Sequence, residues 1–196
     1  VGAFTVAMVM VGWLGPNSQA AHQIALSLAS VTYLIASGFA SAATVRAGNF
    51  VGQKNHLEVK RAGLASLTFV LVFMCSAAAL LIILHNWLPS FFSIEPFVIE
   101  VAAQLLLIAA FFQLADGTQV VALGMLRGMR DVKIPTYITL ISYWLIGLPA
   151  SYMLGFVLDQ GIEGVWYGLT LSLFLVSIFS VYRWFSLVNK TIKQSL

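Results

Sequence analysis

Long stretches without a charged side chain constrain this sequence most. No Asp, Glu, Lys or Arg precedes Arg46, and uncharged runs also cover residues 62–94, 134–158 and 164–182. A helix needs about 20 apolar residues to cross a hydrocarbon layer ~30 Å thick. Only 9% of the 196 residues are charged and 60% are hydrophobic, which is too apolar for a water-soluble core. The sequence therefore predicts a polytopic membrane protein.

The turn-forming cluster at residues 15–19 divides the first uncharged run, and the charges divide the rest. We expect spans at residues 20–45, 62–86, 98–126, 134–158 and 164–183, followed by a tail at 184–196. Residues 1–14 are too short for a span and predict the second part of another helix, so we expect the chain to be a fragment. Each span should be helical, because lipid offers no partner for free backbone amides. The expected fold is an all-α bundle of five full transmembrane helices and part of a sixth.

Charge placement predicts the orientation of these spans. If the turn at residues 15–19 faces outward, all ten Lys and Arg residues fall on the inner side, while Glu95, Glu100, Asp159 and Glu163 fall outside. Cytoplasmic loops retain positive charge. We therefore expect a multi-pass protein of the inner (plasma) membrane with a cytoplasmic C-terminus. On this scheme Trp144 lies about mid-span, away from the headgroup layers, and His22 is interpreted as interfacial.

Asp116 is the strongest candidate for function. A carboxylate in the hydrocarbon region costs several kcal/mol, roughly 2.5 to 3.5 on insertion scales, so such residues usually serve a purpose. Gln113 and Gln119 stand three residues to either side and are expected on the same helix face. The functional interpretation is a cation or proton site that faces a cavity. The alternative is a protonated Asp that hydrogen-bonds a neighbouring helix.

A second polar stripe follows the span at 20–45 and includes Gln23 and Ser27, with Tyr33 beside it. The stripe is either a packing seam of small residues or the wet wall of a cavity opposite Asp116.

In the span at 134–158, Pro149 and Gly147 predict a kink or a break, since proline removes a backbone donor. Such a break either supplies carbonyl oxygens to a site or only bends the helix. Tyr143 precedes it and is a candidate hydrogen-bond donor into the same cavity.

Other patterns predict packing or exclude functions. Glycines spaced four apart, at 48 and 52, 124 and 128, and 164 and 168, predict close helix contacts. With one carboxylate in the membrane and no Ser and His at one depth, an enzyme is disfavoured. A phosphate-binding loop, a metal-ligand cluster and a second cysteine beside Cys75 are absent from the sequence. We expect no cofactor, no structural metal and no nucleic-acid partner.

Four segments carry a family resemblance. The sequences AHQIA at 21–25, QLADGTQV at 113–120, GMLRGMRD at 124–131 and YWLIGLP at 143–149 resemble the multidrug and toxic compound extrusion (MATE) family. They occur in the order and at the separations of the C-terminal lobe of that family, from the latter part of its seventh helix through its twelfth.

The resemblance implies one lobe of a two-lobe, twelve-helix transporter of the bacterial inner membrane. It implies export of cationic or amphipathic compounds in exchange for sodium ions or protons, with Asp116 in the cation site and Gln119, Tyr143 and Gln23 as weaker candidates for the cavity lining. The residue pattern adds Gln113, Ser27 and Tyr33 as cavity candidates. The N-terminal lobe of the same protein is absent, so transport by this chain alone is not expected. A lipid-linked oligosaccharide flippase, a membrane scaffold and a channel are the alternatives.

Overall fold

The computed structural model describes the backbone of residues 2–194 and the side chains of residues 2–193. Within that range the chain is helical and contains no β-strand: α1 Gly2–Trp13, α2 Pro16–Gly52, α3 His56–Leu84, the 3-10 turn η1 Leu88–Phe91, α4 Pro96–Gly128, α5 Lys133–Leu140, η2 Ile141–Gly147, α6 Leu148–Tyr152, η3 Met153–Val157 and α7 Gly161–Gln194. The elements from α5 to η3 form one continuous helical segment of 25 residues.

Five helices are long and apolar enough to cross a membrane: α2, α3, α4, the α5 to η3 segment and α7. This confirms the predicted all-α bundle of five long helices, and α1 is the shorter sixth piece. The helices run past several of the expected span limits, and α7 continues to Gln194 through most of the expected tail. Charged residues end an apolar run but do not end a helix, because backbone hydrogen bonds continue through them. Val1, Ser195 and Leu196 lie outside the described residues.

Turn residues mark the helix ends. Gly15 has φ 106° and precedes Pro16 at the start of α2, so the predicted turn after α1 needs a residue without a side chain. Asn55 caps α3, where its side chain accepts a hydrogen bond of 3.3 Å from the Glu58 amide. The Arg130 backbone turns into the left-handed region, with φ 62°, after α4. Short turns therefore join α1 to α2, α2 to α3 and α4 to α5, whereas a longer connection that contains η1 joins α3 to α4.

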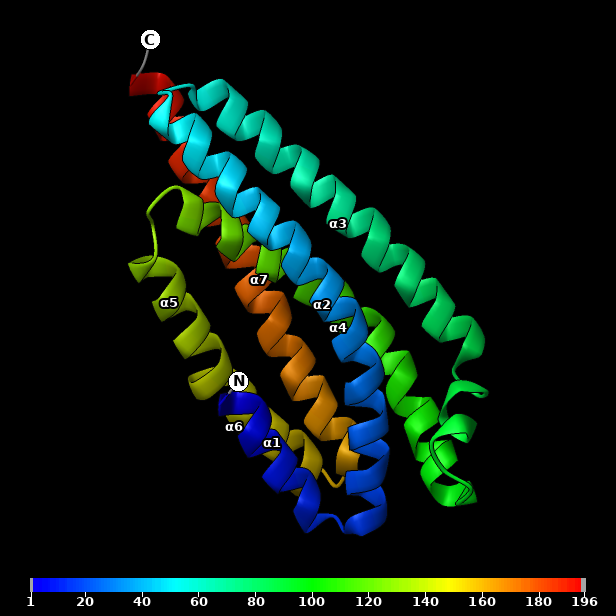
Figure 1. The fold of residues 1–196 in the computed structure, drawn as a ribbon. Helices are drawn as coiled ribbons and strands as arrows, with labels where there is room; N and C mark the ends of the chain where they lie inside the picture. Colours follow the sequence, from blue (N-terminus) through cyan, green and yellow to red (C-terminus); the bar gives the residue numbers. More distant parts are fainter. Residues whose placement is uncertain (1, 195–196) are drawn as a thin grey trace.

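The bundle has three helices at its centre. In Figure 1, α2, α4 and α7 run side by side, α3 covers one flank, and α1 lies with the α5 to η3 segment on the other. The largest buried side chains include Trp166, Leu105, Leu106 and Leu169, which join α4 to α7. A second cluster around Trp184, Met74 and Met125 joins α3, α4 and α7. The core is thus a seam along α4.

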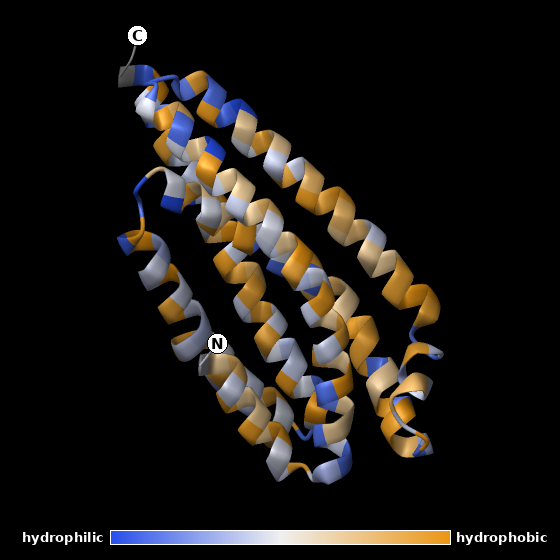
Figure 2. Ribbon diagram, viewed as in Figure 1, coloured by the Kyte–Doolittle hydropathy of each residue, from blue (hydrophilic) through white to orange (hydrophobic). Residues whose placement is uncertain are grey.

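Charged residues separate to the two ends of the bundle. Figure 1 places the α2–α3 turn, the α4–α5 turn and the C-terminal end of α7 together, and these segments carry the Lys and Arg residues, so we name this the basic end. The α1–α2 turn, η1 and the start of α7 lie at the opposite, acidic end, with Glu95 and Asp159. Figure 2 shows hydrophobic residues along the helix lengths between these ends.

His22 does not lie at a polar surface. It is fully buried between α2 and α7, where Trp166 Nε1 donates a hydrogen bond of 3.0 Å to His22 Nδ1. The interfacial depth of His22 stays a prediction, but its side chain faces α7 and not the headgroup layer. Its position near the end of an apolar run indicates its depth in the membrane, but the side of the helix it occupies depends on packing against α7.

One ion pair ties the α4–α5 turn to α7 at the basic end. Arg183 Nε lies 2.7 Å from Asp131 Oδ2, and both side chains are partly buried. We expect a double-mutant cycle with Asp131→Asn and Arg183→Gln to give a coupling free energy of about 1 kcal/mol, because partial burial places the pair at the upper end for exposed ion pairs. Denaturant titrations of the four proteins in detergent measure it. Additive effects of the two changes would show that the pair contributes nothing.

Candidate functional site

A cavity of about 830 Å³ opens between α1, α2, α4 and the segment formed by α5 and η2. Apolar and aromatic side chains make up most of its lining, and polar side chains lie among them. The residues that give it its character are Phe4, Tyr33, Phe112, Asp116, Gln119 and Tyr143. The volume falls within the usual range for drug-sized ligands, which occupy concave and mostly apolar sites.

Asp116 lies on α4 and lines this cavity, half-buried. Among the described residues, its carboxylate has no hydrogen-bond or ion-pair partner. Along the same face of α4, Val120, Leu123 and Arg127 also line the cavity. Asp116 and Arg127 are eleven residues apart, which is about 16 Å along a helix, and Arg127 Nε donates a hydrogen bond of 3.2 Å to the Leu123 carbonyl oxygen. The carboxylate therefore faces the cavity with its acceptor sites open.

Gln119 and Tyr143 form a buried polar pair next to Asp116. Tyr143 Oη donates a hydrogen bond of 3.1 Å to Gln119 Oε1, and both side chains line the cavity. This contact joins α4 to η2, a stretch in which the helix is wound with π-type hydrogen bonds. The amide group of Gln119 fixes the phenol at the wall, so the two act as one polar unit.

Aromatic rings make up much of the remaining wall. Phe4 packs edge-on against Phe112, with ring centroids 6.0 Å apart, and lies 6.0 Å from Tyr143. Tyr33 and Trp144 complete the aromatic lining from α2 and η2. Faces of such rings attract cations, and their area suits flat apolar groups. The cavity thus combines one unpaired carboxylate with several rings.

Three candidate lining residues lie elsewhere. Gln113 is buried on another side of α4, where its Oε1 accepts a hydrogen bond of 3.0 Å from Thr32 of α2. Residues six apart differ by about 120° around a helix, so Gln113 and Gln119 flank Asp116 in different directions rather than sharing its face. Gln23 and Ser27 border a separate hollow of about 300 Å³ with Phe92 and Ser93 of the η1 region. The face of α2 that lines the main cavity carries Leu26, Ala29, Ser30 and Tyr33 instead.

The expected break at Gly147 and Pro149 takes another form. The segment remains helical from Lys133 to Val157, but its winding changes to π-type in η2, before Pro149, and again in η3. Looser winding is a common response where the regular hydrogen-bond ladder is interrupted. Gly147 allows close contact with Ser172 of α7, so this part of the segment is packed rather than unwound.

Sequence reasoning missed part of the wall. Phe4 and Phe112 lie in apolar runs, where the sequence does not distinguish a phenylalanine that lines a cavity from one in the core. Trp144 was recognisable as unusual, because it lies at mid-span, away from the headgroup layers in which membrane proteins usually place tryptophan. The structure places it in the cavity lining.

The chain resembles known proteins in both sequence and structure. Residues 1–153 match the family model MatE. The probable multidrug resistance protein NorM of Xylella fastidiosa is 36% identical over 182 residues, which cover 93% of this chain and 39% of that protein. The protein of the same name from Pseudomonas syringae pv. tomato is 38% identical over 192 residues, covering 93% and 41%. The chain thus spans about two fifths of the length of these curated relatives.

Solved structures agree on the fold. The eukaryotic MATE transporter AtDTX14 superposes with a TM-score of 0.87 at 21% identity, over 99% of this chain and 45% of that one. A MATE protein in the bent conformation gives 0.88 at 16% identity, over 98% and 44%. A MOP superfamily transporter from Pyrococcus furiosus gives 0.82 at 17% identity, over 92% and 40%. Since the family model covers residues 1–153, most of the sequence, the chain belongs to the MatE family.

Proposed function

We propose that this chain forms the C-terminal lobe of a multidrug efflux antiporter, which exports cationic or amphipathic compounds in exchange for sodium ions or protons. The observation that carries the proposal is the unpaired Asp116 carboxylate at the wall of an aromatic cavity of about 830 Å³. The names of the NorM relatives, which are probable multidrug resistance proteins, support the substrate class.

The Asp116 carboxylate allows the cavity to bind different cations alternately. An ionised Asp116 in apolar surroundings is unfavourable, and a sodium ion, a proton or an organic cation each offsets that cost. One carboxylate binds one of them well at a time. If the coupling ion and the drug favour different arrangements of the helices, each displaces the other, and the ion gradient drives export.

The aromatic wall supports an amphipathic organic substrate. The rings of Phe4, Tyr33 and Tyr143 line the cavity and suit the apolar part of a ligand, and Asp116 lies in the same lining for its positive charge. No directional hydrogen-bond pattern is required for such binding, which suits a protein that accepts several compounds.

The proposed setting is a bacterial inner membrane with the basic end in the cytoplasm. Cytoplasmic segments are enriched in Lys and Arg, and here these residues gather at one end of the bundle. The partners are then the lipid bilayer and a second lobe of the same protein, since the chain spans only about two fifths of its curated relatives.

Inverted membrane vesicles that contain the complete reading frame test the proposal. We expect them to accumulate a fluorescent organic cation such as ethidium when a sodium or a proton gradient is imposed, and to stop when that gradient is dissipated. Comparing the two gradients identifies the coupling ion. Accumulation that needs ATP and neither gradient, or no accumulation above empty vesicles, would contradict the antiporter.

A further inference from the structure

His22 lies behind the wall of the cavity and does not line it. The side chain is fully buried, and its ring meets that of Trp166 edge to face at 74°, with centroids 5.6 Å apart. Trp166 Nε1 lies 3.0 Å from His22 Nδ1. An indole N–H only donates, so this contact requires a lone pair on Nδ1 and a proton on Nε2. His22 therefore serves here as a neutral acceptor with one defined tautomer.

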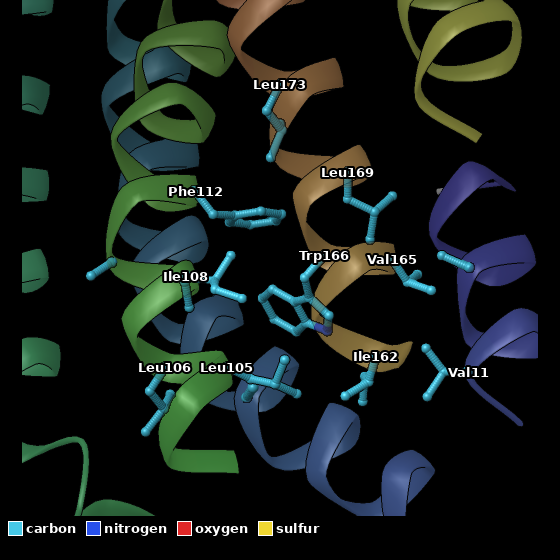
Figure 3. Packing of buried hydrophobic residues seen from close by; sticks show 14 of the residues in the cluster. Val11, Leu105, Leu106, Ile108, Phe112, Ile162, Val165, Trp166, Leu169 and Leu173 are labelled. Carbon is cyan, nitrogen blue, oxygen red and sulfur yellow. The ribbon is translucent and has the colours of Figure 1, made fainter. Parts of the chain in front are cut away.

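A row of ring contacts connects Trp166 to the cavity. Its indole lies 5.6 Å from the ring of Phe112, which packs on Phe4, which in turn packs on Tyr143. Figure 3 shows Trp166 between Phe112 and Ile162, with its nitrogen turned away from Phe112. The three outer rings line the cavity, whereas His22 and Trp166 do not. The rotation of the indole thus sets the surface on which Phe112 rests.

We infer that His22 is a positioning residue for the substrate cavity: its Nδ1 holds Trp166 in one orientation, and Trp166 holds the aromatic wall formed by Phe112 and Phe4. The inference rests on the proposed function and deepens it, because it assigns part of the substrate affinity to a residue the substrate does not touch.

The hydrogen bond between Trp166 and His22 fixes the indole in a way that packing alone does not. Without an acceptor, the buried Trp166 N–H would lose its hydrogen bond, and the contact that fixes the rotation of the indole would be gone. A turned indole would move Phe112, since interiors are close-packed and a shifted ring displaces its neighbour. Tyr143 packs on Phe4 and shifts with it, whereas the Asp116 carboxylate has no hydrogen bond to these rings and keeps its charge. The inference therefore predicts weaker substrate binding with ion coupling intact.

Three variants separate positioning from simple packing. His22→Leu fills the space but removes the acceptor, whereas His22→Asn places an amide oxygen two bonds from Cβ, as Nδ1 is. Trp166→Phe removes the donor and retains an aromatic ring. His85→Leu is the matched control, because His85 is only half-buried and hydrogen-bonds the carbonyl oxygen of Ile82 in its own helix turn.

Transport kinetics of ethidium in inverted vesicles with the complete reading frame provide the first readout. We expect His22→Leu and Trp166→Phe each to raise KM about fivefold or more while the maximal rate changes less than twofold. His22→Asn is expected to restore KM to within twofold of the original protein, and His85→Leu to leave it unchanged.

Tryptophan fluorescence provides a second readout that does not depend on transport. The Trp166 signal is the difference between the original protein and Trp166→Phe, and we expect His22→Leu, but not His22→Asn, to shift its emission maximum. An unchanged KM in both His22→Leu and Trp166→Phe, or a His22→Asn variant no better than His22→Leu, would overturn the inference. If His22→Leu does not accumulate, Trp166→Phe decides alone. Failure of the original protein to export ethidium would instead refute the proposed function.

Discussion

Asp116→Asn is expected to abolish gradient-driven export while the protein still inserts and folds. Asparagine has nearly the same size as aspartate but cannot ionise, so the cavity loses the charge that binds both the coupling ion and a cationic substrate. We expect the rate of ethidium accumulation in inverted vesicles to fall at least tenfold. Stability should be kept or raised, because the change removes an unpaired charge from apolar surroundings.

Two further variants make this result specific to position 116. Glu95→Gln removes a carboxylate at the exposed acidic end, outside the cavity, and should leave export unchanged. Asp116→Glu keeps the charge and should retain measurable export. Near-normal export by Asp116→Asn would remove this residue from the mechanism. Poor accumulation of Asp116→Asn in the membrane would instead favour the interpretation of Asp116 as a packing residue.

The positions of the long helices along the chain were predictable here, and rotation around the helix was less so. Apolar runs located all five long helices, because the hydrocarbon thickness sets a minimum length that few other constraints imitate. The same reasoning predicts that Asp116 lies inside the membrane. The reasoning did not separate Gln113 from Gln119. Their six-residue spacing spans about 120° around α4, and the structure turns Gln113 toward Thr32 of α2 and Gln119 toward the cavity.

Packing between helices explains the rest of what the sequence did not indicate. His22 was expected near a polar surface because of its depth, yet its contact with Trp166 turns it inward. The two π-type stretches also depend on context: the small residues Gly147 and Gly155 meet α7 closely there, and the winding adjusts around Pro149. A single sequence shows that proline interrupts the hydrogen-bond ladder, but the neighbouring helix determines how the ladder is repaired.

The spaced glycines show how far a local motif can be trusted. A Cβ at Gly164 or Gly168 would lie within 2.6 Å of the backbone of the preceding helical segment, so this pair permits close approach as expected. Gly48 approaches Gly128, whereas Gly52 has nothing within 4 Å. The motif predicts closeness only where a partner helix passes, and α2 extends past its partner at Gly52.

The second large effect is expected at the crossing of α2 and α4. A Cβ on Gly124 would lie 2.6 Å from the carbonyl oxygen of Ala40, and one on Gly128 would lie 2.5 Å from that of Thr44. Both contacts are with backbone, which cannot rotate away as a side chain can. We expect Gly124→Ala and Gly128→Ala each to cost about 2 kcal/mol through overpacking, and the double variant to accumulate poorly in the membrane.

Gly38→Ala is the matched control for this crossing, because it makes the same substitution within α2 at a site with nothing within 4 Å. It should be neutral or slightly stabilising, since alanine favours a helix over glycine by up to about 1 kcal/mol. Thermal unfolding in detergent measures all three single variants. Thr44 also lies at the crossing, where its hydroxyl donates a hydrogen bond of 2.9 Å to the Gly124 carbonyl oxygen. Widening the crossing would move α4, and Asp116 with it. If Gly124→Ala is as stable as Gly38→Ala, the two helices are free to separate, and their close contact does not hold the cavity in shape.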